Sequence, residues 1–378
     1  MNETLFKFIT ICCKTNLRKK DKTYIYEFLY EYKDIKLLTK YALKNGVLPT
    51  IYKTIKTLDN IPPQLLQNLK QQNLRIAQKN ILMSAELIKI IKLLEDNNIS
   101  TIALKGPTLS MLAYNDITLR QYGDLDILVQ SDYVYKAASI ISNNNYIPDN
   151  SLEFFKNKTL LKVSSDLGLR NIKNNTYIEL HWKLFRKKLS MLSDTMHIYN
   201  NYTTVHIQNY PIKTLNTELL LVYLCAHGSK HMWERISWIL DIDRIISNTE
   251  NLNWDKVIYN AKQMKALNML LLGLHLSSKF FDTKIPNTIS NLIIDKQSII
   301  LPLEQYTIEI LQNKQYSMKD KFNYHSKLYD SKLDSLKYYI FTLIQPTPDD
   351  ILFINLPNYL SFLYFIIRPF RLVKKYLS

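Results

Sequence analysis

The sequence predicts an α+β protein in which a small mixed β-sheet lies between two helical regions. Apolar residues recur every three or four positions near both ends of the chain, as in amphipathic helices. The centre instead holds short, β-branched or alternating segments that are typical of strands. Because the helical stretches and the strands are segregated along the chain, the pattern favours α+β over a regular βαβ alternation.

The first region, residues 1–97, is predicted to be helical. Apolar residues follow a helical spacing in 35–55 and again in 65–96. Pro62 and Pro63 separate these two stretches.

The sheet-bearing core is predicted to span residues 98–215. Its first strand is expected in 99–105 (ISTIALK), which is β-branched and apolar. Two alternating strands are expected in 124–129 (DLDILV) and 176–182 (TYIELHW). A hairpin over 203–215 would close the core.

Residues 216–378 are predicted to be helical again. Thr217 is a plausible cap for a long helix over 218–246, and helical spacing returns in 254–281. The apolar run in 359–375 is shorter than the roughly 20 residues that span a bilayer. Its aromatic and basic residues suit either a packed terminal helix or a peripheral contact with the inner face of a membrane.

Composition favours an anionic partner. Lys and Arg total 49 against 33 Asp and Glu, a formal charge of +16, which suits nucleotides, RNA or acidic lipid headgroups. The abundance of Lys, Asn, Ile and Tyr beside only six Gly would also follow from AT-rich coding, and compositional bias is therefore an alternative explanation of the charge. Three cysteines cannot form a disulfide framework, which predicts a cytoplasmic protein.

Two strands carry a set of carboxylates suited to metal binding. Asp124 and Asp126 are two residues apart and share one face of their strand, and Glu179 lies with Tyr177 and His181 on one face of a later strand. If the strands are neighbours, Asp124, Asp126 and Glu179 form a three-carboxylate cluster that suits Mg²⁺, with Mn²⁺ as an alternative. Such a cluster can hold two metal ions for an in-line displacement at phosphorus. Taken singly, two aspartates at this spacing are more often a solvated strand end.

The segment 104–129 also supplies candidate phosphate ligands. Gly106 is placed at a strand-to-helix turn, where backbone N–H groups bind phosphate, and Gly123 directly precedes the first aspartate. Lys105 and Arg120 are cations suited to a triphosphate. No Walker A loop, GxGxxG fingerprint or Ser-His-Asp order occurs in the sequence.

A polar stripe on the predicted 218–246 helix offers a second candidate site. His227, His231, Glu234, Trp238 and Asp241 follow a four-three-four-three spacing, with Arg235 beside them. Three interpretations are open. The stripe could make hydrogen bonds on the helix surface, the two histidines could bind zinc, or His227, His231 and Arg235 could line a nucleotide or acceptor pocket.

The order LKG, LRQYGDLDILV, YIELHW and HGSKHMWERISWILDIDRI resembles the uncharacterised nucleotidyltransferase family, a branch of the polymerase-β-like superfamily, over about residues 35–290. The resemblance implies a nucleotidyltransferase core that uses an NTP as co-substrate. It also implies that Asp124 and Asp126 bind Mg²⁺, and that Glu179 deprotonates or orients an acceptor hydroxyl on a small molecule, peptide, protein or RNA.

The chain departs from the usual superfamily motif at one point. Gly106-Pro107 stands where Gly-Gly or Gly-Ser is usual, which removes a hydroxyl ligand for phosphate. We therefore expect Lys105 to help hold the nucleotide. The alternative is a catalytically degenerate core that acts as a basic scaffold for RNA or a protein partner.

Overall fold

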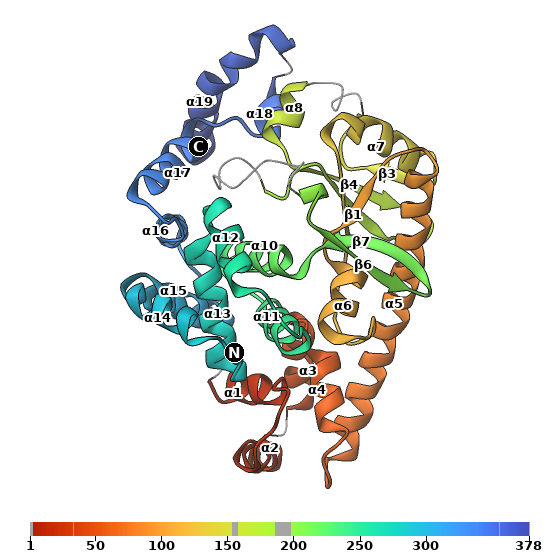
Figure 1. Cartoon of the computed structure of the whole chain (residues 1–378), viewed down its shortest axis with the longest axis vertical. Helices are drawn as coiled ribbons and strands as arrows, with labels where there is room; N and C mark the ends of the chain where they lie inside the picture. The colour runs from red at the N-terminus through yellow and green to blue at the C-terminus, as the bar shows by residue number, and fades with distance from the viewer. Residues whose placement is uncertain (1–2, 33, 153–157, 186–197, 355, 378) are drawn as a thin grey trace.

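A seven-stranded mixed sheet with helices on both faces confirms the predicted α+β class (Figure 1). The computed structural model describes residues 3–32, 34–152, 158–185, 198–354 and 356–377. Its strand order is β3-β4-β5-β2-β1-β7-β6. The strands are β1 (Thr101–Ala103), β2 (Leu125–Val129), β3 (Tyr146–Pro148), β4 (Asp166–Asn171), β5 (Tyr177–His181), β6 (Tyr202–Ile207) and β7 (Tyr210–Leu215).

Helices precede, flank and follow this sheet (Figure 1). Before it come α1 (Glu3–Cys12), α2 (Lys19–Glu31), α3 (Ile35–Lys44), α4 (Leu48–Ile55) and α5 (Pro63–Glu95). Between the strands lie α6 (Gly106–Tyr114), η1 (Ser131–Tyr133), α7 (Val134–Ser142) and α8 (Lys158–Val163). After it come α10 (Thr217–Lys230), α11 (Ile236–Asn248), α12 (Trp254–Gln263), α13 (Leu267–Phe281), α14 (Asn287–Asp295), α15 (Gln297–Leu311), α16 (Met318–Lys327), α17 (Lys332–Ile344), α18 (Pro348–Phe353), η4 (Asn358–Leu363) and α19 (Tyr364–Leu377).

The two faces of β2 enter different cores, as the alternation of its sequence requires. Leu125, Ile127 and Val129 belong to a core that includes buried residues of α5 and α7. Leu128 points the other way, into the core that includes α6 and α10. Asp126 shares that second face, and the alternation therefore directs its carboxylate toward α10 rather than α5.

The strand β2 lies between β1 and β5, which confirms that the two carboxylate-bearing strands are neighbours. It runs antiparallel to β1 and parallel to β5. In the parallel pair, Asp126 is opposite Glu179 and Leu128 is opposite His181. Residues at matching register point to the same face, and the sheet therefore places the Asp126, Glu179 and His181 side chains together.

The predicted continuous helix over 218–246 is wrong. It is interrupted between Lys230, where α10 ends, and Ile236, where α11 begins. Met232 and Trp233 take left-handed φ values of 53° and 54°, and the Trp233 N–H donates to the Gly228 carbonyl at 2.8 Å. The buried indole packs on Gly228, where an added Cβ would lie only 2.4 Å from the ring. Burial of this large ring against a glycine turns the chain and breaks the helix.

The start of α10 also differs in detail from the prediction. Asn216 rather than Thr217 is the N-cap, and its side-chain oxygen accepts a hydrogen bond from the Leu219 N–H. Both residue types are good caps, and a shift of one residue is common at helix ends.

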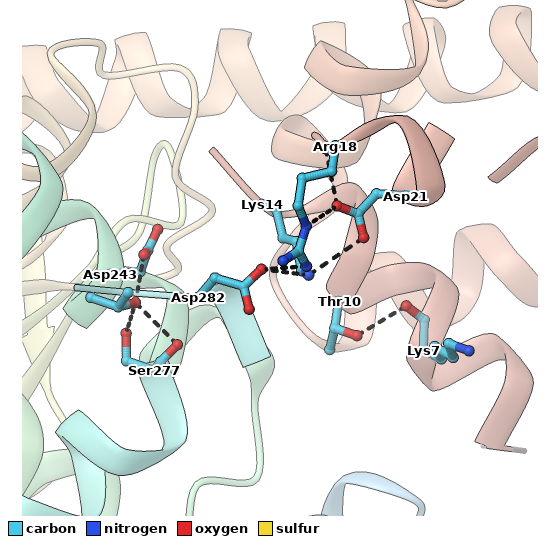
Figure 2. A network of polar contacts seen from close by, with 9 residues as sticks. Lys7, Thr10, Lys14, Arg18, Asp21, Asp243, Ser277 and Asp282 are labelled. Carbon is cyan, nitrogen blue, oxygen red and sulfur yellow. Dashed lines mark hydrogen bonds and ion pairs between the residues drawn. The ribbon is translucent and has the colours of Figure 1, made fainter. Parts of the chain in front are cut away.

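The N-terminal helices are joined to the end of α13 by a charged network (Figure 2). Asp282, which caps α13 in a left-handed conformation, accepts from Lys14 Nζ and from an Arg18 amino group, both at 2.8 Å. Arg18 Nε also lies 3.1 Å from Asp21 at the start of α2. The network therefore links two segments that are more than 260 residues apart in the sequence.

The last helices leave much apolar surface uncovered. About half of the exposed large apolar side chains in the described chain lie beyond residue 332, among them Phe362, Phe365 and Phe370. Within the described ranges, no helix combines the length and apolar character needed to cross a membrane. Arg368 and Arg371, two of the basic residues of the predicted aromatic-basic tail, are ion-paired with the buried Asp350.

Candidate active site

The predicted site residues gather around one cavity of about 750 Å³ between the sheet and the α10–α11 connection. All of them except Gly106 line it: Lys105, Arg120, Gly123, Asp124, Asp126, Glu179, His227, His231 and Arg235. Further cavity residues include Lys79, His181, Tyr223, Lys230, Glu234 and Trp238.

Three side chains converge at the sheet side of this cavity. His181 Nε2 lies 3.2 Å from Asp126 Oδ1 and 3.3 Å from Glu179 Oε2. One potential ligand atom from each of these residues lies within 4.8 Å of the others. Asp126 and His181 are buried, whereas Glu179 is half-buried and reaches the open cavity. Its position makes Glu179 the most accessible of the three groups.

Asp126 is an ionised carboxylate with one uncommitted oxygen. Burial alone raises the pKa of Asp126, but the Lys105 ammonium and the hydrogen bond with His181 outweigh burial and hold this pKa well below its ordinary value. The buried Oδ2 atom has no hydrogen-bond partner in the described part of the chain. An uncommitted, desolvated carboxylate oxygen is costly unless a cation or donor satisfies it.

Lys105 contacts Asp126 directly. Its Nζ lies 3.1 Å from Asp126 Oδ1, and the side chains are only 12% and 1% exposed. Burial lowers the pKa of Lys105, but the carboxylates, Asp126 foremost, outweigh it and raise the pKa above its ordinary value. Lys105 is therefore positively charged, and its ammonium group contacts the same Asp126 oxygen as His181 does.

Asp124 lies just before β2 and lines the same cavity. Burial and the neighbouring Asp126 carboxylate raise the pKa of Asp124. Among the described residues, the cluster of ligand atoms within 4.8 Å contains Asp126, Glu179 and His181 but not Asp124. The predicted trio is thus present in one cavity, while the tightest donor set contains a histidine in place of Asp124.

Arg120 is a buried partner of Asp241. Its Nε donates to both Asp241 oxygens at 3.0 Å, and Tyr114 Oη donates to Asp241 Oδ1 at 2.9 Å. The side chains of Arg120 and Asp241 are 7% and 1% exposed. Arg120 still borders the cavity, although much of its charge is balanced by this carboxylate.

Gly106 begins α6, directly after the cavity residue Lys105. Its φ of +59° lies in the left-handed region that favours glycine, and an added Cβ would meet the Asp124 carbonyl at 3.5 Å. Pro107 follows within the first turn, and one backbone N–H is therefore missing from this helix start.

An aromatic group forms the opposite wall. The ring centroids of His227 and His231 are 4.8 Å apart, and Trp238 lies 5.3 Å and 5.5 Å from them. The Arg235 guanidinium stands 5.8 Å from the Trp238 centroid. His227, His231 and Trp238 of the predicted stripe are therefore brought together by the turn between α10 and α11, not by a single helix. Asp241, the last residue of the stripe, contacts Arg120 instead.

The two histidines of this wall are uncharged at neutral pH. Burial, followed by Lys105, lowers the pKa of His227 well below its ordinary value. Burial and Lys230 lower the pKa of His231 to about 4. No described His, Cys, Asp or Glu joins them in a metal-ligating cluster, which counts against the zinc interpretation.

His181 is the residue that sequence reasoning did not include in the site. Its position two residues after Glu179 already placed both side chains on one face of the strand. That spacing was the signal available in the sequence. The register between β2 and β5 then brings His181 next to Asp126.

Comparisons with known proteins place the chain in a family. Among solved structures, an antigenic nucleotidyltransferase-like protein from Paracoccidioides brasiliensis is similar at 13% sequence identity and a TM-score of 0.36, covering 61% of this chain and 94% of that one. No curated protein matches. The model of a family described as uncharacterised nucleotidyltransferase matches residues 31–282, well over half of the 378-residue chain. The chain belongs to this uncharacterised nucleotidyltransferase family.

Proposed function

We propose that the protein transfers a nucleoside monophosphate from an NTP to an acceptor hydroxyl, with a divalent cation such as Mg²⁺ or Mn²⁺. The convergence of Asp126 and Glu179 on one face of two parallel strands carries this proposal. The acceptor is a hydroxyl of a small molecule, peptide, protein or RNA.

The donor set fits a divalent cation. Two carboxylates and an imidazole supply three ligand atoms, and the partnerless Oδ2 of Asp126 is a buried acceptor beside them. Asp124, at the cavity border, would supply a further oxygen. A cation bound here would stabilise negative charge that develops on the phosphoryl oxygens.

The cationic side chains of the cavity fit the triphosphate. Lys105 is charged and lies next to the donor set, and Arg235 and Lys79 border the same cavity. Since Lys105 and a cation would share the Asp126 carboxylate, we propose that Lys105 moves to the phosphates when the nucleotide binds. The neutral His227 and His231 rings and the Trp238 indole would then lie against the base.

In the proposed reaction, the acceptor oxygen forms a bond to the α-phosphorus, and the bond from that phosphorus to the bridging oxygen of the β-phosphate breaks. Pyrophosphate leaves with the electron pair of the broken bond. The acceptor proton passes to Glu179, whose partial exposure allows an incoming hydroxyl to reach it. Lys105 and Arg235 would hold the departing pyrophosphate.

Incubation with α-³²P-labelled NTPs tests the proposal in self-labelling, RNA-labelling and small-molecule formats. We expect metal-dependent labelling by the wild type and its loss in Asp126→Asn and Glu179→Gln. Asp132→Asn is the matched control, because Asp132 is an exposed carboxylate in η1, just beyond the other end of β2. A wild type that neither binds NTP nor labels any acceptor contradicts the proposal and favours the basic-scaffold alternative.

The uncovered apolar surface of the last helices supports a separate proposal, a peripheral contact with an anionic membrane. Phe365 and Phe370 of α19 are exposed, and Lys332 and Lys337 of α17 are exposed basic residues in the same C-terminal part of the chain. We expect the wild type to float with anionic liposomes and the double variant Phe365→Asp/Phe370→Asp to remain in solution. Equal flotation of the two proteins would refute this contact.

A further inference from the structure

The geometry points to His181 as a direct ligand of the active-site cation, which makes this a mixed oxygen and nitrogen site that prefers Mn²⁺ to Mg²⁺. The role of this cation in catalysis rests on the proposed nucleotidyl transfer. The metal preference, however, is a property of the protein without bound nucleotide and can be measured in that form.

The position of His181 follows from the sheet. Its Cα is opposite Leu128 in the parallel β2–β5 pair, two residues beyond the pair formed by Asp126 and Glu179. Glu179 and His181 therefore project from the same face of β5, toward the carboxylate of Asp126. The Nε2 atom lies 3.2 Å from one carboxylate and 3.3 Å from the other, which places it in contact with both.

The surroundings favour a ligand over a solvent-facing histidine. The His181 side chain is 9% exposed, and the Asp126 side chain is 1% exposed. Neither Asp126 Oδ2 nor His181 Nδ1 has a hydrogen-bond partner among the described residues. The cluster thus holds two buried polar atoms without a hydrogen-bond partner, and its half-buried member Glu179 borders the cavity.

Ligand chemistry then decides the cation. Mg²⁺ strongly prefers oxygen ligands in a near-ideal octahedron and keeps several waters. Imidazole suits transition metals, while carboxylates also suit Mn²⁺, and a set of two carboxylates and one imidazole therefore matches Mn²⁺ better than Mg²⁺. The competing explanation is that His181 only donates hydrogen bonds that hold the two carboxylates in place.

Electron paramagnetic resonance of nucleotide-free protein with Mn²⁺ separates these explanations. We expect Mn²⁺ to bind, to show hyperfine coupling to an imidazole ¹⁴N, and to resist displacement by Mg²⁺. His181→Asp replaces nitrogen with a hard oxygen ligand. This variant should keep a bound cation, lose the nitrogen coupling, and narrow the Mn²⁺ over Mg²⁺ preference by about tenfold or more, about 1.4 kcal/mol.

His227→Gln is the matched control, since it removes another, half-buried imidazole of the cavity that is outside the donor cluster. It should leave the nitrogen coupling unchanged. The inference is overturned if Mn²⁺ does not bind the wild type, if bound Mn²⁺ shows no nitrogen coupling, or if the coupling persists in His181→Asp. Intact nitrogen coupling in a protein that never labels an acceptor would instead refute the proposed reaction and leave the metal site standing.

Discussion

Replacing Lys105 with methionine should change metal and nucleotide binding in opposite directions. Lys105 Nζ lies 3.1 Å from Asp126 Oδ1, on the carboxylate that a cation would also contact. At that distance the attraction is about 5 kcal/mol at an effective dielectric constant of roughly 20. Since both groups are desolvated, the net value is nearer that of a hydrogen bond to a charged group, about 1.5–3 kcal/mol.

A cation that enters the wild-type site must share the Asp126 carboxylate with Lys105, whereas in Lys105→Met it need not. We therefore expect the affinity for Mn²⁺ without nucleotide to rise by about ten- to a hundredfold, since each 1.4 kcal/mol is about tenfold. Affinity for a non-hydrolysable NTP should fall by a similar factor, because the phosphates lose a charge-assisted hydrogen bond. Isothermal titration calorimetry measures both affinities.

The control is Lys136→Met, which removes an equal charge from α7, a helix that packs on the opposite face of the sheet. It should leave both affinities nearly unchanged. A Lys105→Met protein whose metal affinity is equal to or below that of the wild type would show that Lys105 does not compete with the cation. An equal rise in metal affinity in both lysine variants would point to overall charge instead of the Asp126 contact.

Three further predictions concern the framework of the site. Asp241→Asn leaves the Arg120 guanidinium buried without a full counter-charge and should lower the unfolding free energy by roughly 3–5 kcal/mol in urea denaturation; a loss below about 1 kcal/mol would contradict this. Gly228→Ala places a Cβ 2.4 Å from the Trp233 ring and should lower the unfolding free energy by about 1–3 kcal/mol. Gly123→Ala, whose added Cβ would have no atom within 4 Å, should leave the unfolding free energy nearly unchanged. Equal melting temperatures of the two variants would refute the packing argument. Burial raises the pKa of Asp350, but hydrogen bonds from Thr347 and two arginines outweigh burial and lower this pKa. The ion pairs should therefore stabilise α18 and α19 at pH values above the ordinary carboxyl pKa. This stabilisation should be lost as the pH falls through the lowered pKa of Asp350. Limited proteolysis of the C-terminal segment should thus increase in acid for the wild type, but depend much less on pH in Asp350→Asn.

Local pattern was enough to predict the class of fold and the face of each carboxylate. Alternation in 124–129 and 176–182 places Asp126 and Glu179 on one side of their own strands whatever the strands pair with, because side-chain direction depends only on backbone geometry. The helical spacing near both ends was equally local. The domain boundaries at residues 97 and 215 stay a prediction.

The turn between α10 and α11 shows where local pattern fails. Helical spacing continues from Thr217 to Ile246, and nothing in that spacing marks an interruption. The break depends on the Trp233 indole packing against Gly228 and near Gly273 of α13. A packing partner 40 positions away outweighs helix propensity, which contributes only tenths of a kcal/mol per residue.

By itself, the sequence determined which residue types were available, which of them share a strand face, and the family to which their order belongs. Only the tertiary structure decided that β2 and β5 are parallel neighbours, that His181 contacts both carboxylates, that Lys105 contacts Asp126, and that Arg120 is paired with Asp241. The physical reason is that side-chain direction is set within a few residues, whereas the partner of a buried charge is set by long-range packing, which brings together groups separated by 21 to 121 positions.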